Sequence, residues 1–300
     1  RDYKVTGVQT CALPISRENL DLAMDVAFAV RELLDPSLKL TGYHSHAEAV
    51  REWETAQRRI VAAAAGSPDG AARVALVGAL VDAPSQTSRF DGSTQVSRVA
   101  ATVEAVLTGL GYGTYGRYEI EQRLHGDPSQ VGEDLAARVS PSERQLVDLA
   151  GGAGATDRLL ADVDDGRRPR PDAVARSATG PLGEPTGRLR VPTVTLHTTA
   201  DPLVLVQNER LFADRVRAAG RQDQLLQLYV VPPATFSAPA PYGAGHCAFT
   251  AGQRLAAVDL LDQWVRRGAR PSGSDVHRAI SPVPGMDATY VPAPWPVAAP

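Results

Sequence analysis

Apolar residues recur at helical spacing through most of the first 150 residues of the chain. Two of the predicted helices follow Ser-x-x-Glu sequences at Ser45 and Ser140, in which Ser and Glu cap the first turn. The chain between residues 45 and 163 is therefore expected to form a block of helices. The predicted helices span residues 20–34, 46–65, 71–81, 93–110, 115–124 and 141–150.

The pattern changes to alternating strands and helices after residue 190. A β-branched run at residues 191–196 predicts a buried strand, and residues 225–231 predict a second one. Helical spacing at residues 207–219 and 253–267 places one helix after each strand, and a proline-rich loop precedes the second helix. This order of elements predicts an α/β fold with parallel strands over residues 191–270.

Two segments carry little periodicity. Residues 164–190 are rich in Arg, Pro and Gly, and we expect them to form an extended linker. Residues 271–300 are rich in proline and are expected to lie extended on the surface. Neither segment is predicted to contain a helix or a strand.

The composition is that of an ordinary globular chain. Of the 300 residues, 43% are hydrophobic and 22% are charged, which is enough for a substantial core. A net charge of −3 gives no argument for binding nucleic acid. No apolar run reaches the ~18 residues of a membrane span. The two cysteines, Cys11 and Cys247, do not make a disulfide framework.

Residues 1–15 have the sequence RDYKVTGVQTCALPI, which resembles the in-frame translation of a common sequencing-adapter oligonucleotide. The alternative is a natural strand at residues 5–10. If the segment is an adapter scar, natural sequence begins near Ser16, and everything before it, including any signal peptide, is missing. The compartment is then not indicated by the sequence. Residues 16–44 are expected to be a residual core helix and loop.

Asp201 and His246 are the candidate catalytic residues. Asp201 follows the strand at residues 191–196, and His246 follows the strand at residues 225–231 in the segment Gly-Ala-Gly-His. In an open parallel sheet, ligands bind beyond the carboxyl ends of the strands. A carboxylate there can orient an imidazole base that removes a proton from a nucleophile. The alternative is that Asp201 only caps the turn before the next helix and His246 is a loop histidine held by a hydrogen bond.

An acid after one strand and a histidine after the next resemble the last two members of the Ser…Asp…His order of the α/β-hydrolase family. The resemblance covers residues 191 to about 268. It implies a truncated hydrolase sheet with only the last parallel strands, preceded by a large helical lid over residues 45–163. It also implies hydrolysis of a small ester or amide through an acyl-enzyme, with Asp201 as the orienting carboxylate, His246 as the base, and no cofactor or metal.

The nucleophile of that family is missing from this chain. No serine lies in a Gly-x-Ser-x-Gly elbow, which also supplies an oxyanion-hole amide. Ser45 is the nearest imitation, and it is better explained as a helix cap. Cys247 is expected to be a buried structural thiol. The family order places the elbow before the lid, so the chain as given is expected to be inactive.

Two rival interpretations stay open. An α/β-hydrolase with an Asp nucleophile, similar to dehalogenases or epoxide hydrolases, would use the same Asp201 and His246. A non-catalytic helical binding domain with an α/β appendage would need neither residue as a working pair. Weaker motifs have simpler explanations: His44-x-His46 as loop histidines rather than a metal pair, the glycines at 151–154 as a helix stop, and His197 as a core histidine.

Overall fold

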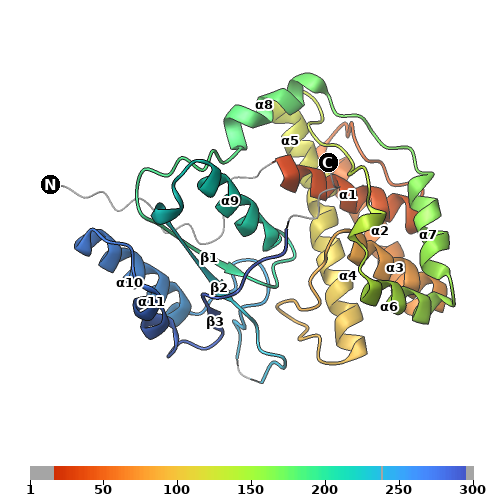
Figure 1. Ribbon diagram of the computed structural model, residues 1–300. Coiled ribbons are helices and arrows are strands. Elements are labelled where there is room, and N and C mark those ends of the chain that lie inside the picture. The colour runs from red at the N-terminus through yellow and green to blue at the C-terminus, as the bar shows by residue number, and fades with distance from the viewer. Residues whose placement is uncertain (1–16, 238, 295–300) are drawn as a thin grey trace. The chain divides into compact units, whose positions relative to one another are not determined.

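The computed structural model describes residues 17–237 and 239–294, and the chain divides into two compact units (Figure 1). Among the described residues, the α/β unit comprises Gln86–Ser93 and residues 185–294. The helical unit comprises residues 17–85 and 94–184. The mixed α/β class predicted from the sequence is therefore confirmed. The interpretation of residues 1–15 falls outside the described residues.

A three-stranded sheet forms the centre of the α/β unit (Figure 1). Strand β1 (Thr193–Thr198) pairs in parallel with β2 (Leu225–Val230), and β3 (Met286–Asp287) pairs antiparallel with β2. The sheet thus contains an antiparallel edge in addition to the two predicted parallel strands. β1 begins two residues later than predicted, because Val191 is exposed, and it extends through Thr198.

Helices lie on both sides of the sheet (Figure 1), and successive side chains of a strand point to opposite sides. Helix α9 (Gln207–Ala218) lies on one face, and α10 (Ala251–Arg267) and α11 (Gly273–Ile280) lie on the other. α10 begins with a capping box at Thr250 and ends at Gly268 in the left-handed conformation. The apolar core beneath α10 and α11 contains Val194, Leu196, Leu226, Leu228, Val230, Phe249, Ala257, Leu260, Leu261, Trp264, Val276 and Ile280.

The prediction of an extended tail after residue 271 is wrong for the described part of that segment. Ser272 and Asp275 form a capping box that starts α11, and this helix places Val276 and Ile280 in the core. The chain then returns to pair with the sheet as β3. The prolines concealed both elements, because they lie around the helix and the strand rather than inside them.

The helical unit is built around α3, an apolar helix that contacts α1, α2, α4, α6 and α7. Helix α1 belongs to this unit, so the prediction that residues 16–44 are a remnant of the α/β core is wrong. The helices are α1 (Arg17–Leu33), α2 (His46–Gly66), α3 (Pro68–Leu80), α4 (Gln95–Gly111), α5 (Arg117–Leu124), α6 (Pro141–Gly151), α7 (Ala155–Asp164) and α8 (Ala173–Gly183).

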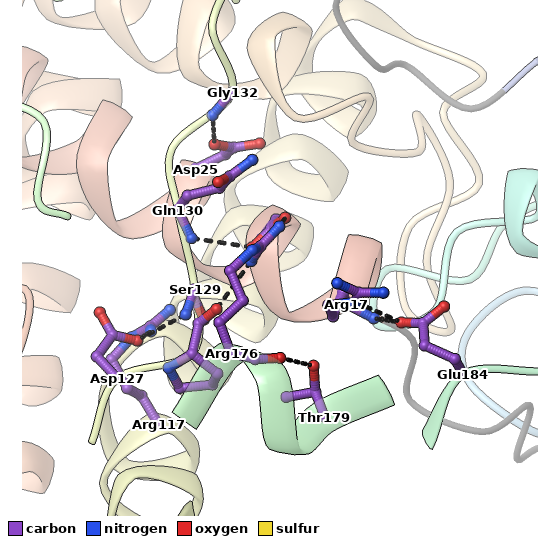
Figure 2. A network of polar contacts seen from close by, with 12 residues as sticks. Arg17, Asp25, Arg117, Asp127, Ser129, Gln130, Gly132, Arg176, Thr179 and Glu184 are labelled. Atoms are coloured by element: carbon purple, nitrogen blue, oxygen red, sulfur yellow. Dashed lines mark hydrogen bonds and ion pairs between the residues drawn. The ribbon is translucent and has the colours of Figure 1, made fainter. Parts of the chain in front are cut away.

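The predicted linker at residues 164–190 contains a helix, so it is not extended throughout. Asp172 accepts hydrogen bonds from two backbone amides and starts α8. Arg176 of α8 then forms a bidentate ion pair with Asp21 of α1, at 2.8 and 2.9 Å (Figure 2). Local periodicity did not indicate this helix because an ion pair across 155 residues of sequence anchors it.

Helix α4 ends at Gly111, one residue after the predicted bound, but the chain does not leave the helical conformation there. The chain continues through a π-helical turn, η1 (Tyr112–Gly116), directly into α5. A Cβ atom at Gly113 would lie 2.5 Å from the carbonyl oxygen of Ala23 and 2.9 Å from the Cβ of Ala27. Glycine is present here because η1 passes against the backbone of α1, and not because the helix stops.

A buried carboxylate holds the segment between α5 and α6 against α1 (Figure 2). Asp25 is 2% exposed, and it accepts hydrogen bonds from the backbone amide of Gly132 and from Arg138, both at 2.8 Å. Asp21, one turn earlier on α1, accepts from the amide of Gln130 at 2.9 Å. Burial raises the pKa of Asp25 to about 6, although Arg138 acts in the opposite direction.

Candidate active site

The backbone brings the segments that carry Asp201 and His246 together beyond the ends of β1 and β2. Ala200, which precedes Asp201, forms an isolated parallel bridge with Ala244. The amide of Gly245, which precedes His246, donates a 2.7 Å hydrogen bond to the carbonyl of Ala200. The two side chains therefore start from neighbouring points of the backbone, at the carboxyl ends of the parallel strands, as the sequence predicted.

The two candidate residues form a direct hydrogen bond. His246 Nδ1 lies 2.9 Å from Oδ2 of Asp201. An ionised carboxylate can only accept hydrogen bonds, so the proton between these atoms resides on Nδ1. In the neutral imidazole Nε2 is then the free acceptor. This tautomer is the one that a general base requires.

The other oxygen of Asp201 is held by the backbone. Oδ1 accepts hydrogen bonds from the amides of Leu203, at 2.8 Å, and Val204, at 3.0 Å. The residue is 4% exposed, so the carboxylate is fixed in a protected position. Asp201 therefore caps a turn and orients the imidazole at the same time, which combines the two roles that the sequence left as alternatives.

The environment of His246 favours its protonated form. The hydrogen bond to Asp201 raises the pKa of His246, and partial burial acts in the opposite direction. The side chain is 33% exposed. Its Nε2 has no hydrogen-bond partner among the described residues. The imidazole thus has one nitrogen fixed by a carboxylate and the other available to a reacting group.

His197 is close to this pair but does not join it. The residue is 6% exposed, and its Nδ1 donates to the carbonyl oxygen of Thr198 at 2.8 Å. Its Nε2 is 4.0 Å from Oδ2 of Asp201, which is beyond hydrogen-bond distance. The prediction of a core histidine is confirmed.

Both glycines before His246 adopt positive φ angles, +79° at Gly243 and +94° at Gly245. A side chain at Gly243 would collide with Val230, the last residue of β2. A Cβ atom at Gly245 would lie 3.3 Å from the Cβ of Ser88 and 3.5 Å from its amide nitrogen. The glycines therefore act both as turn residues and as points of close backbone approach.

Residues 86–93 are a part of the site's surroundings that the sequence did not indicate. They lie between α3 and α4 in the chain but belong to the α/β unit. Gln86 donates a 3.0 Å hydrogen bond to the carbonyl of Pro233, and Asp91 accepts from the amide of Phe236 at 3.2 Å. These bonds hold Ser88 beside Gly245. No local motif marks a contact between segments more than 140 residues apart.

The serine closest to an elbow motif has a structural role. Ser45 is the N-cap of α2, and its Oγ accepts from the amide of Glu48 at 3.1 Å. The predicted capping box is incomplete, because the Glu48 carboxylate accepts from the amide of His44 instead of that of Ser45. Ser45 lies in the helical unit, and no hydrogen bond joins it to His246. The capping box predicted at Ser140 is complete.

Cys247 differs from its prediction. It is only partly buried, and its sulfur is not a free thiol. The prediction of a buried structural thiol at Cys247 is therefore wrong. Its φ of +59° is one of few positive values at non-glycine residues in the described chain. This conformation turns the backbone immediately after His246.

His44 and His46, which were expected to be loop histidines rather than a metal pair, lie at the start of α2. The His46 ring lies against the rings of Tyr115 and Tyr118, at centroid distances of 6.1 and 6.2 Å. In the described ranges, no group of three or more His, Cys, Asp and Glu side chains is arranged to hold a metal ion. The glycines at 151–154 separate α6 from α7 and thus form a helix stop. None of the helices described here is long and apolar enough to cross a membrane.

The fold and the site together define a mixed α/β protein with a paired carboxylate and imidazole at the ends of its parallel strands. Comparisons with protein-family models, with curated proteins and with solved structures gave no match. The site must therefore be interpreted from its own chemistry.

Proposed function

We propose that Asp201 and His246 are the acid and base of an α/β-hydrolase that cleaves small esters or amides through an acyl-enzyme. The observation that carries the proposal is the 2.9 Å contact between His246 Nδ1 and Asp201 Oδ2 at the carboxyl ends of β1 and β2. In this role His246 Nε2 removes the proton of the nucleophile and later returns it to the leaving group. Asp201 stabilises the imidazolium that forms between these steps.

The contacts of the pair support this assignment over a purely structural one. A turn-capping Asp needs only the two amide contacts of Oδ1, whereas here Oδ2 also binds the imidazole. A loop histidine held only for stability would have no reason to keep Nε2 accessible. A loop histidine held by a hydrogen bond would also contact Asp201, so the support for catalysis comes from the accessible Nε2 and from the position of the pair at the carboxyl ends of β1 and β2.

The proposed nucleophile is a serine in an elbow encoded upstream of Ser16, since no Gly-x-Ser-x-Gly sequence occurs in the 300 residues. The test is to recover the genomic reading frame upstream of that codon, produce the extended protein, and measure turnover of a p-nitrophenyl ester. We expect an elbow with Ser and a burst of acyl-enzyme formation. An elbow with Asp would instead assign the pair to a dehalogenase- or epoxide-hydrolase-like enzyme.

Variants of the extended protein separate catalysis from stability. Substitutions Asp201→Asn and His246→Ala should each lower kcat by roughly three to four orders of magnitude. The matched control is His277→Ala, which removes an exposed histidine of α11. Full activity of His246→Ala, or an upstream frame without any elbow, would refute the proposal. So would His246-dependent ester turnover by residues 1–300 alone, because the nucleophile would then lie within this chain.

A further inference from the structure

The helical unit contains a cavity of about 220 Å³ between α3, α4 and α6. Its walls are made of small apolar side chains, among them Ala75 and Gly78 of α3, Val99 of α4 and Leu146 of α6. Leu146 is 45% exposed, so the cavity opens to the surface. We call it the α3–α4–α6 pocket. Such a lining favours an apolar ligand group.

The helices around the pocket are in firm contact. A Cβ atom at Gly78 would lie 2.5 Å from Cγ2 of Thr102, so α3 and α4 approach closely at this point. α3 and α6 also pack along much of their lengths. The pocket is therefore a concavity of a packed structure and not a gap between loosely associated helices.

Two charged side chains line the pocket, Glu143 and Arg98, and they differ in their hydrogen bonds. Glu143 lines it, but one of its carboxylate oxygens accepts from the amide of Ser140 at 2.7 Å as part of a capping box. Arg98 also lines it; this residue is exposed, and among the described residues its guanidinium has no hydrogen-bond or ion-pair partner. A planar guanidinium of this kind matches a carboxylate with two parallel hydrogen bonds.

The position of Arg98 strengthens this preference for an anion. It lies in the first turns of α4, which begins at Gln95 and carries no acidic residue in its first turn. The N-terminus of a helix carries a partial positive charge that an acidic side chain often balances. Here neither that charge nor the guanidinium is balanced by a neighbouring carboxylate of the same turn.

We propose that the α3–α4–α6 pocket binds a small monocarboxylate with an apolar tail, its carboxylate on Arg98 and its tail among Ala75, Val99 and Leu146. A dry cavity of about 150 Å³ accommodates the six carbons of benzene. By the same proportion, 220 Å³ accommodates a tail of roughly eight carbons. The site is independent of Asp201 and His246, and it would stand if the proposed hydrolase function failed.

The test is titration calorimetry of the 300-residue chain with sodium octanoate, and with 1-octanol as a probe of equal length without charge. We expect saturable binding of octanoate and binding of octanol that is weaker by about fivefold or more. The variant Arg98→Gln should bind both probes equally. The variant Ala75→Phe, which fills the pocket from a half-buried position on α3, should bind neither.

The matched control is Arg51→Gln, which removes an exposed arginine of α2 outside the pocket and should bind octanoate as the unchanged chain does. Thermal unfolding of each variant verifies that the fold is intact. Lack of octanoate binding, equal affinity for the two probes, or unchanged affinity in Arg98→Gln would each overturn the proposal. Binding that survives Ala75→Phe would place the ligand elsewhere and would overturn it as well.

Discussion

Ala200 and Ala244 lie side by side as a parallel bridge just beyond the sheet, and neither is part of a named strand. The bridge extends the pairing of β1 with β2 toward Asp201 and His246. Gly245 completes it, because its amide donates to the carbonyl of Ala200. The alignment of Asp201 with His246 therefore depends on the backbone pairing of Ala200 with Ala244, the residues that lie close before them in the chain.

The first prediction concerns Gly245→Ala. The residue has a φ of +94°, and a Cβ atom would press against Ser88, so the substitution should cost about 1–3 kcal/mol and loosen the Asp201–His246 contact. The pKa of His246, followed by NMR, should fall. Gly220→Ala is the control, because Gly220 also has a positive φ but no neighbour at its Cβ position. An unchanged His246 pKa in Gly245→Ala would contradict the prediction.

A second prediction concerns the pH dependence of stability. The hydrogen bond to Asp201 raises the pKa of His246 above its ordinary value, so the folded state binds this proton more tightly than the unfolded chain. The resulting stabilisation is fully present below the unfolded pKa and is lost as the pH rises through the folded pKa. Asp201→Asn should therefore lower the free energy of unfolding more at about pH 5.5 than at about pH 8.5.

The measurement is urea denaturation of both proteins at the two pH values. Part of the loss should be independent of pH, because an asparagine oxygen cannot serve the amides of Leu203 and Val204 and the imidazole as well as two carboxylate oxygens do. If Asp201→Asn lowers the free energy of unfolding equally at both pH values, Asp201 does not stabilise the protonated form of His246, and the prediction is wrong.

The third prediction concerns Glu209 of α9, which is 2% exposed against the sheet. Its Oε2 accepts hydrogen bonds from Thr195, at 2.7 Å, and from Gln227, two residues that are directly paired across β1 and β2. Glu209→Ala would leave the buried Thr195 hydroxyl without its acceptor and Gln227 with only the backbone carbonyl of residue 209, and should cost about 2 kcal/mol. Chemical denaturation measures the cost.

The adjacent residue provides the control for this substitution. Arg210 forms an ion pair with Asp214 at 3.0 Å on the solvent side of α9. Arg210→Ala should cost less than about 0.5 kcal/mol, as is usual for a surface pair. Similar losses for the two variants would mean that the Glu209 contacts do not hold α9 on the sheet.

The fourth prediction concerns Asp25 in the helical unit (Figure 2). Its pKa of about 6 lies above the ordinary value of 3.8, so its contribution to stability is fully present below the unfolded value and is lost as the pH rises through about 6. The uncharged Asp25→Asn has no such loss. As the pH rises from about 4.5 to about 7.5, the Tm of Asp25→Asn should therefore increase relative to the Tm of the unchanged protein. A difference that stays constant would contradict the assignment.

Sequence patterns predicted the parts of the fold that rest on local periodicity. Strands β1 and β2 and helices α9 and α10 were expected within two residues of their observed bounds. Helices α8 and α11 were not, because they are short and are fixed by distant partners, Asp21 for one and the core under Val276 for the other. Tertiary contacts of this kind leave little trace in local sequence.

The same distinction applies to the candidate site. Asp201 and His246 could be named because both follow strand ends, and the structure places them in hydrogen-bond contact. Turn capping by Asp201 was foreseen only as an alternative to catalysis, whereas its two oxygens serve both, with Oδ1 on the amides of Leu203 and Val204. Ser88 could not have been found, because nothing in its own sequence indicates a position beside Gly245.

The assignment of residues 86–93 to the α/β unit has a consequence for how the protein can be divided. The polypeptide passes from one unit to the other after residue 85, returns after residue 93, and changes again after residue 184. A truncation that begins at residue 185 would thus remove Gln86 and Asp91, the two anchors of the loop before His246. The α/β unit is therefore not encoded by residues 185–294 alone, because one of its segments lies between two helices of the helical unit in the sequence.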